Sequence, residues 1–341
     1  RVSRRRMVAF AVICVGCIAA TAASLLVAIH RSAAPPNAGA SGAGGPAPEG
    51  PRLMFRTTAA GDAYGHLAVV PLGQPNARPV IEPLACDRVA YAAGRGVCLT
   101  TEPGVLTTYA VTVFDASYRS LFTRELVGIP SRAQVSPDGH LASVTVFVAG
   151  DSYAAAGFST RTAILDLRTG NWAAYLEHFA VTKDGARFQA IDFNFWGVTF
   201  AADSDTFYAT LATQGTTYLV KGRVSTQQVT VLREGVECPS LSPDGTRIGF
   251  KKRVLDQSGP IMWTISVLDL ATLRDHPLSE SRNVDDQVAW LDNGHILYGL
   301  PHAQSGFGSS STDAWVVAAD GSGAPKIFIA NAWSPAVVPA G

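Results

Sequence analysis

The residues that could take part in chemistry are carboxylates and histidines that lie far apart in the sequence. Asp192, Asp285 and Asp286 are the candidates for general acid and base work, and two carboxylates would have to approach to about 5–10 Å to act on a glycosidic bond. The seven histidines occur without HxH or HExxH spacing, and no G-x-S-x-G motif marks a hydrolase nucleophile. The motifs therefore predict no catalytic residue, and an enzyme would depend on acids that the fold brings together.

The cysteines after the first fifty residues predict a disulfide. Cys86 and Cys98 are centred on the turn Ala92–Arg95, so in a regular hairpin they face each other across two strands. The alternative is two buried free thiols. Together with the distant Cys238 they lack the clustered histidines of a zinc site. The acidic turn 203–205 lacks the following Gly and distal Glu of a calcium loop. We therefore predict no metal and no cofactor.

The N-terminal part of the chain predicts a membrane anchor. Met7 to Ile29 is a run of 23 residues without a charge, and about 20 apolar residues in a helix cross a ~30 Å hydrocarbon core. Four arginines among residues 1–6 favour a cytoplasmic N-terminus. We therefore predict a basic cytoplasmic segment (1–6), a transmembrane signal anchor (7–29) and a single-pass protein of the cell membrane whose remainder is exported.

Two alternatives concern the fate of this apolar run. A cleavable signal peptide would release the domain as a secreted protein, but its apolar region usually has 7–15 residues. A lipoprotein would use Cys17, but Cys14 stands where Leu is expected, and apolar sequence continues for twelve residues beyond Cys17. The length of the run favours a retained anchor.

The composition of the remaining chain excludes a nucleic-acid partner. Residues 30–51 are rich in Ala, Gly and Pro and predict a flexible linker. The whole chain has 27 basic and 27 acidic residues, but five of the basic ones lie at the ends of the apolar run. The remainder is therefore weakly acidic and has no Lys/Arg run, whereas nucleic-acid binding domains carry a basic patch.

From Arg52 to the end at Gly341 (52–341), the pattern is that of an all-β domain with internal repeats. Short runs rich in Val, Ile, Thr, Tyr and Phe alternate with Gly/Asp/Pro turns. The segment Ser136-Pro137-Asp138-Gly139 recurs as Ser242-Pro243-Asp244-Gly245, and weaker copies give turn positions at 94, 205 and 294. Intervals of ~40–50 residues with four strands are typical of propeller blades.

The end of the chain supplies a partial copy of the repeat. The interval between the turns at 139 and 205 is longer than the others. Residues Trp333–Val338 resemble the inner strand of a blade, whose outer strands would come from Leu53–Thr57, His66–Leu72 and Arg78–Ile81. We therefore predict six blades, the first of which is shared by the two ends of the domain. Such closure hides the sheet edges that an open array would expose.

The S-P-D-G hairpin with an aliphatic strand on each side, in six blades behind an export signal, resembles the TolB-like group of WD40-like propellers. The resemblance covers Arg52 to Val338, and only the copies around Ser136 and Ser242 are strong. It implies a six-bladed β-propeller acting as an extracytoplasmic binding or scaffold module. The separate N-terminal α/β domain of TolB is replaced here by the apolar run and linker.

Propeller geometry then predicts where a ligand would bind. If the SPDG hairpins lie on one rim, the connections that enter each inner strand lie on the other, and loops on a rigid scaffold are where function concentrates. The candidate binding residues on that second rim are Asp87, Arg88, Arg132, Asp192, Phe193, Phe195, Trp196, Asp285, Asp286 and Trp333.

The aromatic stretch Gln189–Trp196 falls in the long interval, where we expect an insertion of about 20 residues over the usual period. Its three aromatic residues, Phe193, Phe195 and Trp196, suit an interface hot spot. The alternative is that they pack the junction between the third and fourth blades.

These observations favour a membrane-tethered binding or scaffold propeller for a protein or cell-envelope polymer. The alternative is a carbohydrate-active lyase or hydrolase with Asp192, Asp285 and Asp286 at the channel mouth. A sensory role would need a partner in the membrane, because a cytoplasmic segment of six residues cannot hold a signalling domain.

Overall fold

The computed structural model describes residues 50–148, 159–254, 261–302 and 311–339. The predicted cytoplasmic segment 1–6, the transmembrane helix 7–29 and nearly all of the linker lie outside these residues. Within the described ranges, no helix has the length and apolarity needed to span a membrane.

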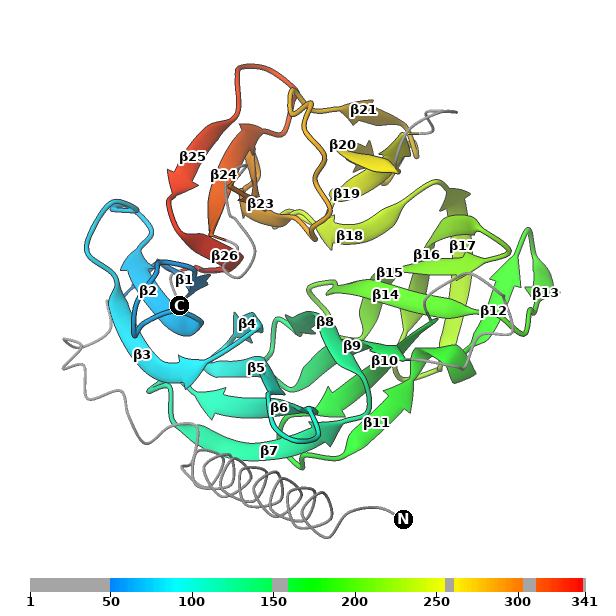
Figure 1. Ribbon diagram of the computed structural model, residues 1–341. Helices are drawn as coiled ribbons and strands as arrows, with labels where there is room; N and C mark the ends of the chain where they lie inside the picture. Colours follow the sequence, from blue (N-terminus) through cyan, green and yellow to red (C-terminus); the bar gives the residue numbers. More distant parts are fainter. Residues whose placement is uncertain (1–49, 149–158, 255–260, 303–310, 340–341) are drawn as a thin grey trace, which may run out of the picture.

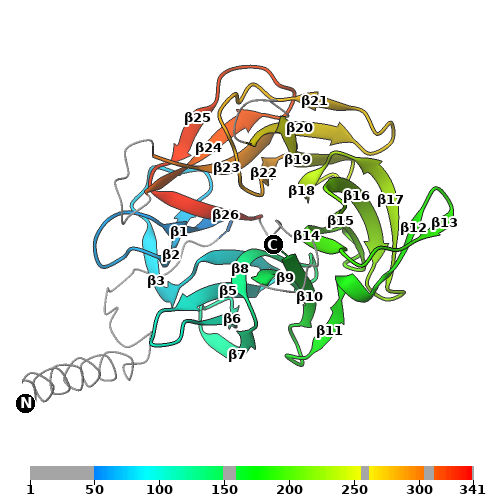
Figure 2. The same ribbon diagram turned by 45° about the vertical axis from the view of Figure 1, so that its right-hand side comes forward.

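The described strands form six sheets arranged as blades around a central axis (Figures 1 and 2). Blade 1 contains β26 (Ala332–Val338), β1 (Arg52–Thr57), β2 (His66–Pro71) and β3 (Val80–Ala85). Blade 2 contains β4 (Arg88–Ala92), β5 (Arg95–Glu102), β6 (Thr108–Asp115) and β7 (Ser120–Leu126). Blade 3 contains β8 (Ile129–Val135), β9 (Leu141–Val148), β10 (Ser159–Asp166) and β11 (Trp172–Tyr175).

The second half of the ring is built in the same way. Blade 4 contains β14 (Asn194–Phe200), β15 (Thr206–Thr213), β16 (Thr216–Arg223) and β17 (Gln228–Glu234), with β12 (Ala180–Lys183) and β13 (Ala186–Phe188) outside them. Blade 5 contains β18 (Glu237–Leu241), β19 (Arg247–Val254), β20 (Met262–Asp269) and β21 (Asp275–Pro277). Blade 6 contains β22 (Ala289–Asp292), β23 (His295–Pro301), β24 (Thr312–Ala318) and β25 (Lys326–Ile329). The predicted all-β, six-bladed propeller is confirmed.

The ring closes in blade 1, where the end of the chain pairs with the start of the domain. Strand β26 runs antiparallel to β1, with Arg52 opposite Val338 and Thr57 opposite Ala332. The predicted inner strand is therefore correct. The third strand of the blade is displaced from its predicted place, because β3 begins at Val80 and continues to Ala85.

The SPDG turns are held by a local network that occurs twice in the same form. The Ser136 hydroxyl donates to Asp138 Oδ1 at 2.6 Å and accepts from the Leu141 backbone at 2.9 Å. Ser242 makes the equivalent bonds to Asp244 at 2.6 Å and from the Arg247 backbone at 2.9 Å. The hydroxyls of Ser242 and Thr246 hold the pKa of Asp244 at about 2. The repeated motif thus acts as a self-contained turn at the outgoing end of an inner strand.

The insertion in blade 4 is the outer hairpin β12–β13. Strand β12 pairs in parallel with β17 and antiparallel with β13, which widens this sheet to six strands. The preceding 3₁₀ turn η1 (Leu176–His178) connects it to blade 3. The prediction that Gln189–Trp196 forms the insertion was wrong, because Asn194 to Phe200 is the ordinary inner strand β14.

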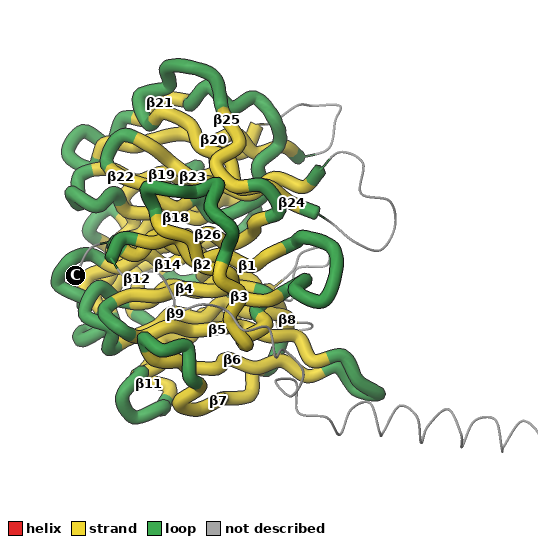
Figure 3. The backbone as a smooth tube through the Cα atoms, turned by 90° about the vertical axis from the view of Figure 1, so that its left-hand side faces the viewer, coloured by secondary structure: helices red, strands yellow, loops and turns green. Residues whose placement is uncertain are grey.

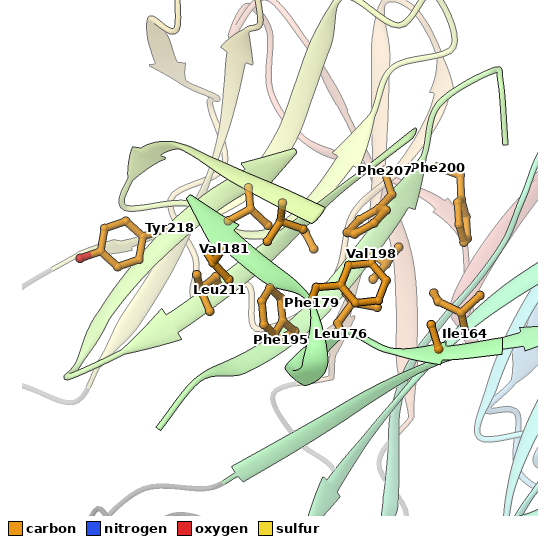
Figure 4. Packing of buried hydrophobic residues seen from close by; sticks show 14 residues of the cluster. Ile164, Leu176, Phe179, Val181, Phe195, Val198, Phe200, Phe207, Leu211 and Tyr218 are labelled. Carbon is orange, nitrogen blue, oxygen red and sulfur yellow. The ribbon is translucent and has the colours of Figure 1, made fainter. Parts of the chain in front are cut away.

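The hydrophobic core lies between adjacent blades. At the junction of blades 3 and 4, Ile164 and Leu176 from blade 3 pack with the large aromatic residues of blade 4 (Figure 4). Phe195 is fully buried in this cluster, and Trp196 retains only 8% of its surface. Phe193 is half-buried and contacts Phe188 and Phe195 with ring centroids 5.3 and 6.3 Å apart. The position of Phe195 agrees with the alternative that these aromatics pack the blade junction. Trp196 is buried but is not part of this cluster.

Candidate binding site at the channel mouth

Strand direction divides the ring into two faces. Each inner strand of blades 3 and 5 ends in an SPDG turn, so the residues that begin the inner strands lie on the opposite face. We call these the SPDG face and the mouth face. Seen from the side, the strands cross the ring and the connecting loops gather at its two faces (Figure 3). The mouth face collects residues from the starts of β4, β18 and β26 and from the segment just before β22.

Arg88 joins three blades at the start of the channel. Its Nη1 donates to Asp286 Oδ1 at 2.8 Å, although the two residues are 198 positions apart. Its guanidinium carbon lies 4.7 Å from the centroid of the Trp333 ring. The Arg88 and Asp286 side chains are 15% and 1% exposed. Burial lowers the pKa of Arg88 and Asp286 works against this shift, but an arginine remains charged in either case.

Trp333 is held against the backbone of blade 6. A Cβ added at Gly299 would lie 2.4 Å from the Trp333 ring, so only glycine permits this contact. The Asp286 carboxylate also accepts a bond of 3.4 Å from the Gly299 backbone. Arg88 in β4, Trp333 in β26 and Asp286 in the segment before β22 are therefore held together as one unit.

A second group of charges on the same face belongs to blade 5 and the segment before β22. Lys251 donates to Asp285 at 2.5 Å, and its ammonium lies 4.6 Å from the Trp263 ring centroid. Glu237 accepts a bond of 3.1 Å from the Trp263 indole and pairs with Arg253 at 3.2 Å. Lys251 and Glu237 are each only 4% exposed. These buried charges are matched one to one.

Arg132 lies in β8 and makes few contacts of its own. Its Nη1 donates to the Ser131 carbonyl at 2.9 Å, whereas its Nε is buried without a hydrogen-bond partner. No ion pair joins it to a carboxylate of the described residues. Burial acts to lower the pKa of Arg132, but the nearby Cys238 and Asp286 outweigh it and the pKa is raised. The guanidinium is therefore a charged donor with unused capacity.

The inner strands approach each other closely through bulges. Gly197, Cys238 and Ser334 all have left-handed φ angles, of 64°, 50° and 53°, and each lies at a register shift of its strand. A Cβ at Gly197 would lie 2.6 Å from the Cys238 Cα atom. The Ser334 hydroxyl accepts from the Val89 backbone at 3.2 Å. These bulges position Cys238 beside Arg132 and Trp333 beside Arg88.

A cavity of about 200 Å³ lies along the axis between these strands. Both Arg88 and Arg132 line it, together with residues of β18, β22 and β26. A wider cavity of about 770 Å³ opens at the SPDG face, lined by residues such as Tyr91, Phe200 and Asp244. The two cavities share lining residues such as Tyr91 and Leu241, so they are neighbours along the channel.

Five of the ten predicted binding residues meet at the channel mouth: Arg88, Arg132, Asp285, Asp286 and Trp333. Asp192 does not join them, because it accepts bonds from the Thr213 hydroxyl at 2.5 Å and the Gln214 backbone at 2.7 Å. The bonds from Thr213 and Gln214 lower the pKa of Asp192. Phe193 and Asp192 line a separate cavity of about 430 Å³ between blades 3 and 4.

Asp87 also lies apart, in a cavity of about 520 Å³ between blades 1 and 2. Cys86 and Cys98 line the same cavity and are joined by a disulfide. Cys98 lies in β5, and Cys86 directly precedes Asp87. The free thiol of Cys238 is buried. Within the described residues, no group of three or more His, Cys, Asp and Glu side chains could hold a metal ion.

Sequence reasoning missed Lys251 and Trp263. Both lie in the middle strands of blade 5 rather than in the connections to inner strands. Strand alternation could have indicated that Lys251 is buried. It lies two residues after Gly249 and so on the same face of β19, which packs against blade 6. A buried lysine at such a position requires a carboxylate partner, and only the fold reveals that this partner is Asp285.

A scan against protein-family models finds no match, and a search of curated proteins finds none. Among solved structures, TolB from Acinetobacter baumannii is similar, with 16% identity and a TM-score of 0.55 over 85% of this chain and 67% of that chain. A chain from a nidogen/laminin complex is also similar, with 10% identity and a TM-score of 0.53 over 84% of this chain and 98% of that one. At these identities the likeness concerns the fold. The chain therefore has a TolB-like propeller fold.

Proposed function

We propose that this protein is a membrane-tethered, extracytoplasmic propeller that binds a protein or cell-envelope polymer through its mouth face. The observation that carries the proposal is the set of charged and aromatic side chains that five blades contribute to that face. Contacts between blades, such as Arg88–Asp286 and Lys251–Asp285, hold several of these charges in place, which preorganises a recognition surface. One structurally similar chain comes from a nidogen/laminin complex, so this fold occurs in a protein complex.

The attachment point supports the same orientation. The predicted anchor and linker precede Arg52, which pairs with Val338 at the SPDG end of β26. The tether would therefore join the propeller on the SPDG face. The channel mouth would be turned away from the point of attachment and remain open to a partner.

The acids at the mouth favour binding over catalysis. Asp285 is paired with Lys251, Asp286 is paired with Arg88, and Glu237 is engaged by Trp263 and Arg253. Asp192, the third acid of the enzyme hypothesis, is bonded to Thr213 and Gln214 in blade 4. A carboxylate held in such a pair is poorly placed to exchange protons with a substrate.

Site-specific photocross-linking of the full chain tests the proposed face. A photoreactive residue would replace Gln287, which lines the axial cavity, or Lys326, which is exposed on the outer strand β25 of the same blade. We expect adducts from position 287 in intact cells and few from position 326. Protease treatment of the adduct identifies a protein, and glycan hydrolases identify a polymer. Equal adducts at both positions, or none at position 287 in a folded chain, would overturn the proposal.

Fractionation tests the tether separately. We expect the chain to remain in the membrane pellet after alkaline carbonate washing, and externally added protease to degrade the propeller in cells without an outer barrier. Recovery in the soluble secreted fraction would instead favour a cleaved signal. Recovery in the cytosol would contradict both interpretations.

A further inference from the structure

The charges at the channel mouth do not balance. Three cations have carboxylate partners, in the pairs Arg88–Asp286, Lys251–Asp285 and Arg253–Glu237. Arg132 is a fourth cation on the same surface and has no such partner among the described residues. One positive charge therefore remains in the neck of the channel. Asp286, which is already bonded to Arg88, and Asp285 stabilise this charge without a direct bond. A ligand carboxylate would supply the direct partner that Arg132 lacks.

The hydrogen bonds of Arg132 lead to the same conclusion. A guanidinium presents five N–H donors, and the bonds found here run from Nη1 to the carbonyl and hydroxyl of Ser131. The Nε is buried without a partner, and Cys238 offers only a weak sulfur acceptor. A carboxylate supplies two acceptor oxygens in the geometry that matches the fork of an arginine.

We propose that Arg132 binds the carboxylate of an acidic peptide side chain that enters the axial cavity, an inference that rests on the proposed function. The cavity volume of about 200 Å³ accommodates one such side chain and not a folded segment. The inner strands of five blades line the cavity, which limits the size of a ligand group that can enter it. The acid would neutralise the charge of Arg132, which has no part in the three internal ion pairs.

The small volume of the cavity favours the side chain of a peptide acid over a sugar acid. Val89, Val288 and Pro335 suit the methylene stem of Asp or Glu, and polar residues such as Gln134 and Gln287 line the cavity beside them. A uronate ring would bring several hydroxyl groups into the same space, and each would need a hydrogen-bond partner. An oligomeric uronate is therefore the alternative that the test must reject.

The test uses the full chain in a non-ionic detergent and two blocked pentapeptides, acetyl-Gly-Gly-Asp-Gly-Gly-amide and its Asn counterpart. Binding is followed through the arginine Nε–H resonances of ¹⁵N-labelled protein. We expect the Asp peptide to shift one resonance and the Asn peptide to shift none. The shifted resonance is assigned to Arg132 because it is missing from the spectrum of Arg132→Gln. The affinity for the Asp peptide should fall at least tenfold in Arg132→Gln and stay unchanged in Arg168→Gln, which removes an exposed arginine of blade 3.

A second variant keeps the test decisive if Arg132→Gln fails to fold. Arg132→Lys retains the charge but loses the fork, and we expect it to keep the fold and bind the Asp peptide more weakly than the native chain does, while still preferring it to the Asn peptide. Equal shifts by both peptides, or unchanged affinity in the Arg132 variants, would overturn the proposal. Displacement of the Asp peptide by a uronate oligomer at lower concentration would reject the peptide as the ligand.

The outcome can be separated from that of the proposed function. Adducts at position 287 together with no response of Arg132 to the Asp peptide would leave the binding face in place and remove the carboxylate site. Absence of adducts at position 287 would remove the binding face, whatever the peptide does at Arg132.

Discussion

The two faces of the propeller use the same kinds of residue in different ways. On the SPDG face, Ser136 bonds to Asp138 two positions away and to the backbone of Leu141 five positions away. On the mouth face, Arg88 bonds to Asp286 across 198 positions. The hydroxyl and carboxylate of an SPDG motif thus shape their own turn, whereas a carboxylate on the mouth face joins blades that are distant in the sequence.

Repetition therefore marks the face that builds the fold, and irregularity marks the face that can specialise. The SPDG turns also touch their neighbours, because the Asp138 backbone donates to Ser204 and the Asp244 backbone donates to Asn293, both at 3.1 Å. This contact occurs between blades 3 and 4 and again between blades 5 and 6. The contacts of the mouth face differ from one pair of blades to the next.

The largest expected effect comes from the mouth face. Asp286→Asn leaves the largely buried Arg88 without a counter-charge, and we expect the free energy of unfolding to fall by about 3 kcal/mol. The measurement is urea unfolding of the propeller, followed by tryptophan fluorescence. Asp320→Asn, in an exposed turn of the same blade, is the control and should shift the midpoint little. Similar losses of unfolding free energy in both variants would show that the ion pair at the mouth face contributes no special stability.

We expect a smaller, pH-dependent effect on stability from the ionisation of Glu177. This residue lies in η1, directly after β11, at the mouth-face end of blade 3. Burial raises the pKa of Glu177 to about 7, even though the Thr162 backbone donates to its Oε1 at 2.9 Å. The unfolded chain releases this proton near the ordinary value of 4.5. The native state therefore holds the proton longer, and stability falls as pH rises from about 4.5 to about 7.

We expect this loss to amount to roughly 1–2 kcal/mol after allowance for partial exposure. The measurement is the free energy of unfolding at pH 5 and pH 8 for the native chain and for Glu177→Gln. The native chain should lose more stability than the variant between these two values. Parallel profiles would show that the burial of this acid has no energetic consequence.

The smallest effects should come from the SPDG face. Ser136→Ala and Ser242→Ala each remove a hydroxyl that bridges an aspartate and a backbone N–H, and we expect a cost of about 1 kcal/mol each. The two sites lie in blades 3 and 5, so the costs should add to within about 0.5 kcal/mol in the double variant. Ser281→Ala, at an exposed position before β22, serves as the control. A marked departure from additivity would mean that the turns act as a ring and not as local units.

Much of the fold could be predicted because its signals are local. Proline, aspartate and glycine in sequence define a turn whatever surrounds them, and the intervals between turns indicate the blades. The hairpin β12–β13 was not recognised because β12 joins its blade through parallel pairing with β17, some 50 residues later. The burial of Phe195 and Trp196 was left open because the register shift after Trp196 interrupts simple strand alternation.

The sequence by itself determined the turns, the number of blades and the strand that closes the ring, because each depends on nearby residues and on a repeated period. Tertiary structure alone decided which charges meet. Arg88 finds Asp286 and Lys251 finds Asp285, while Arg132 finds no carboxylate among the described residues. The physical reason is that an ion pair depends on distance in space, and ring closure sets that distance between residues with no pattern in common.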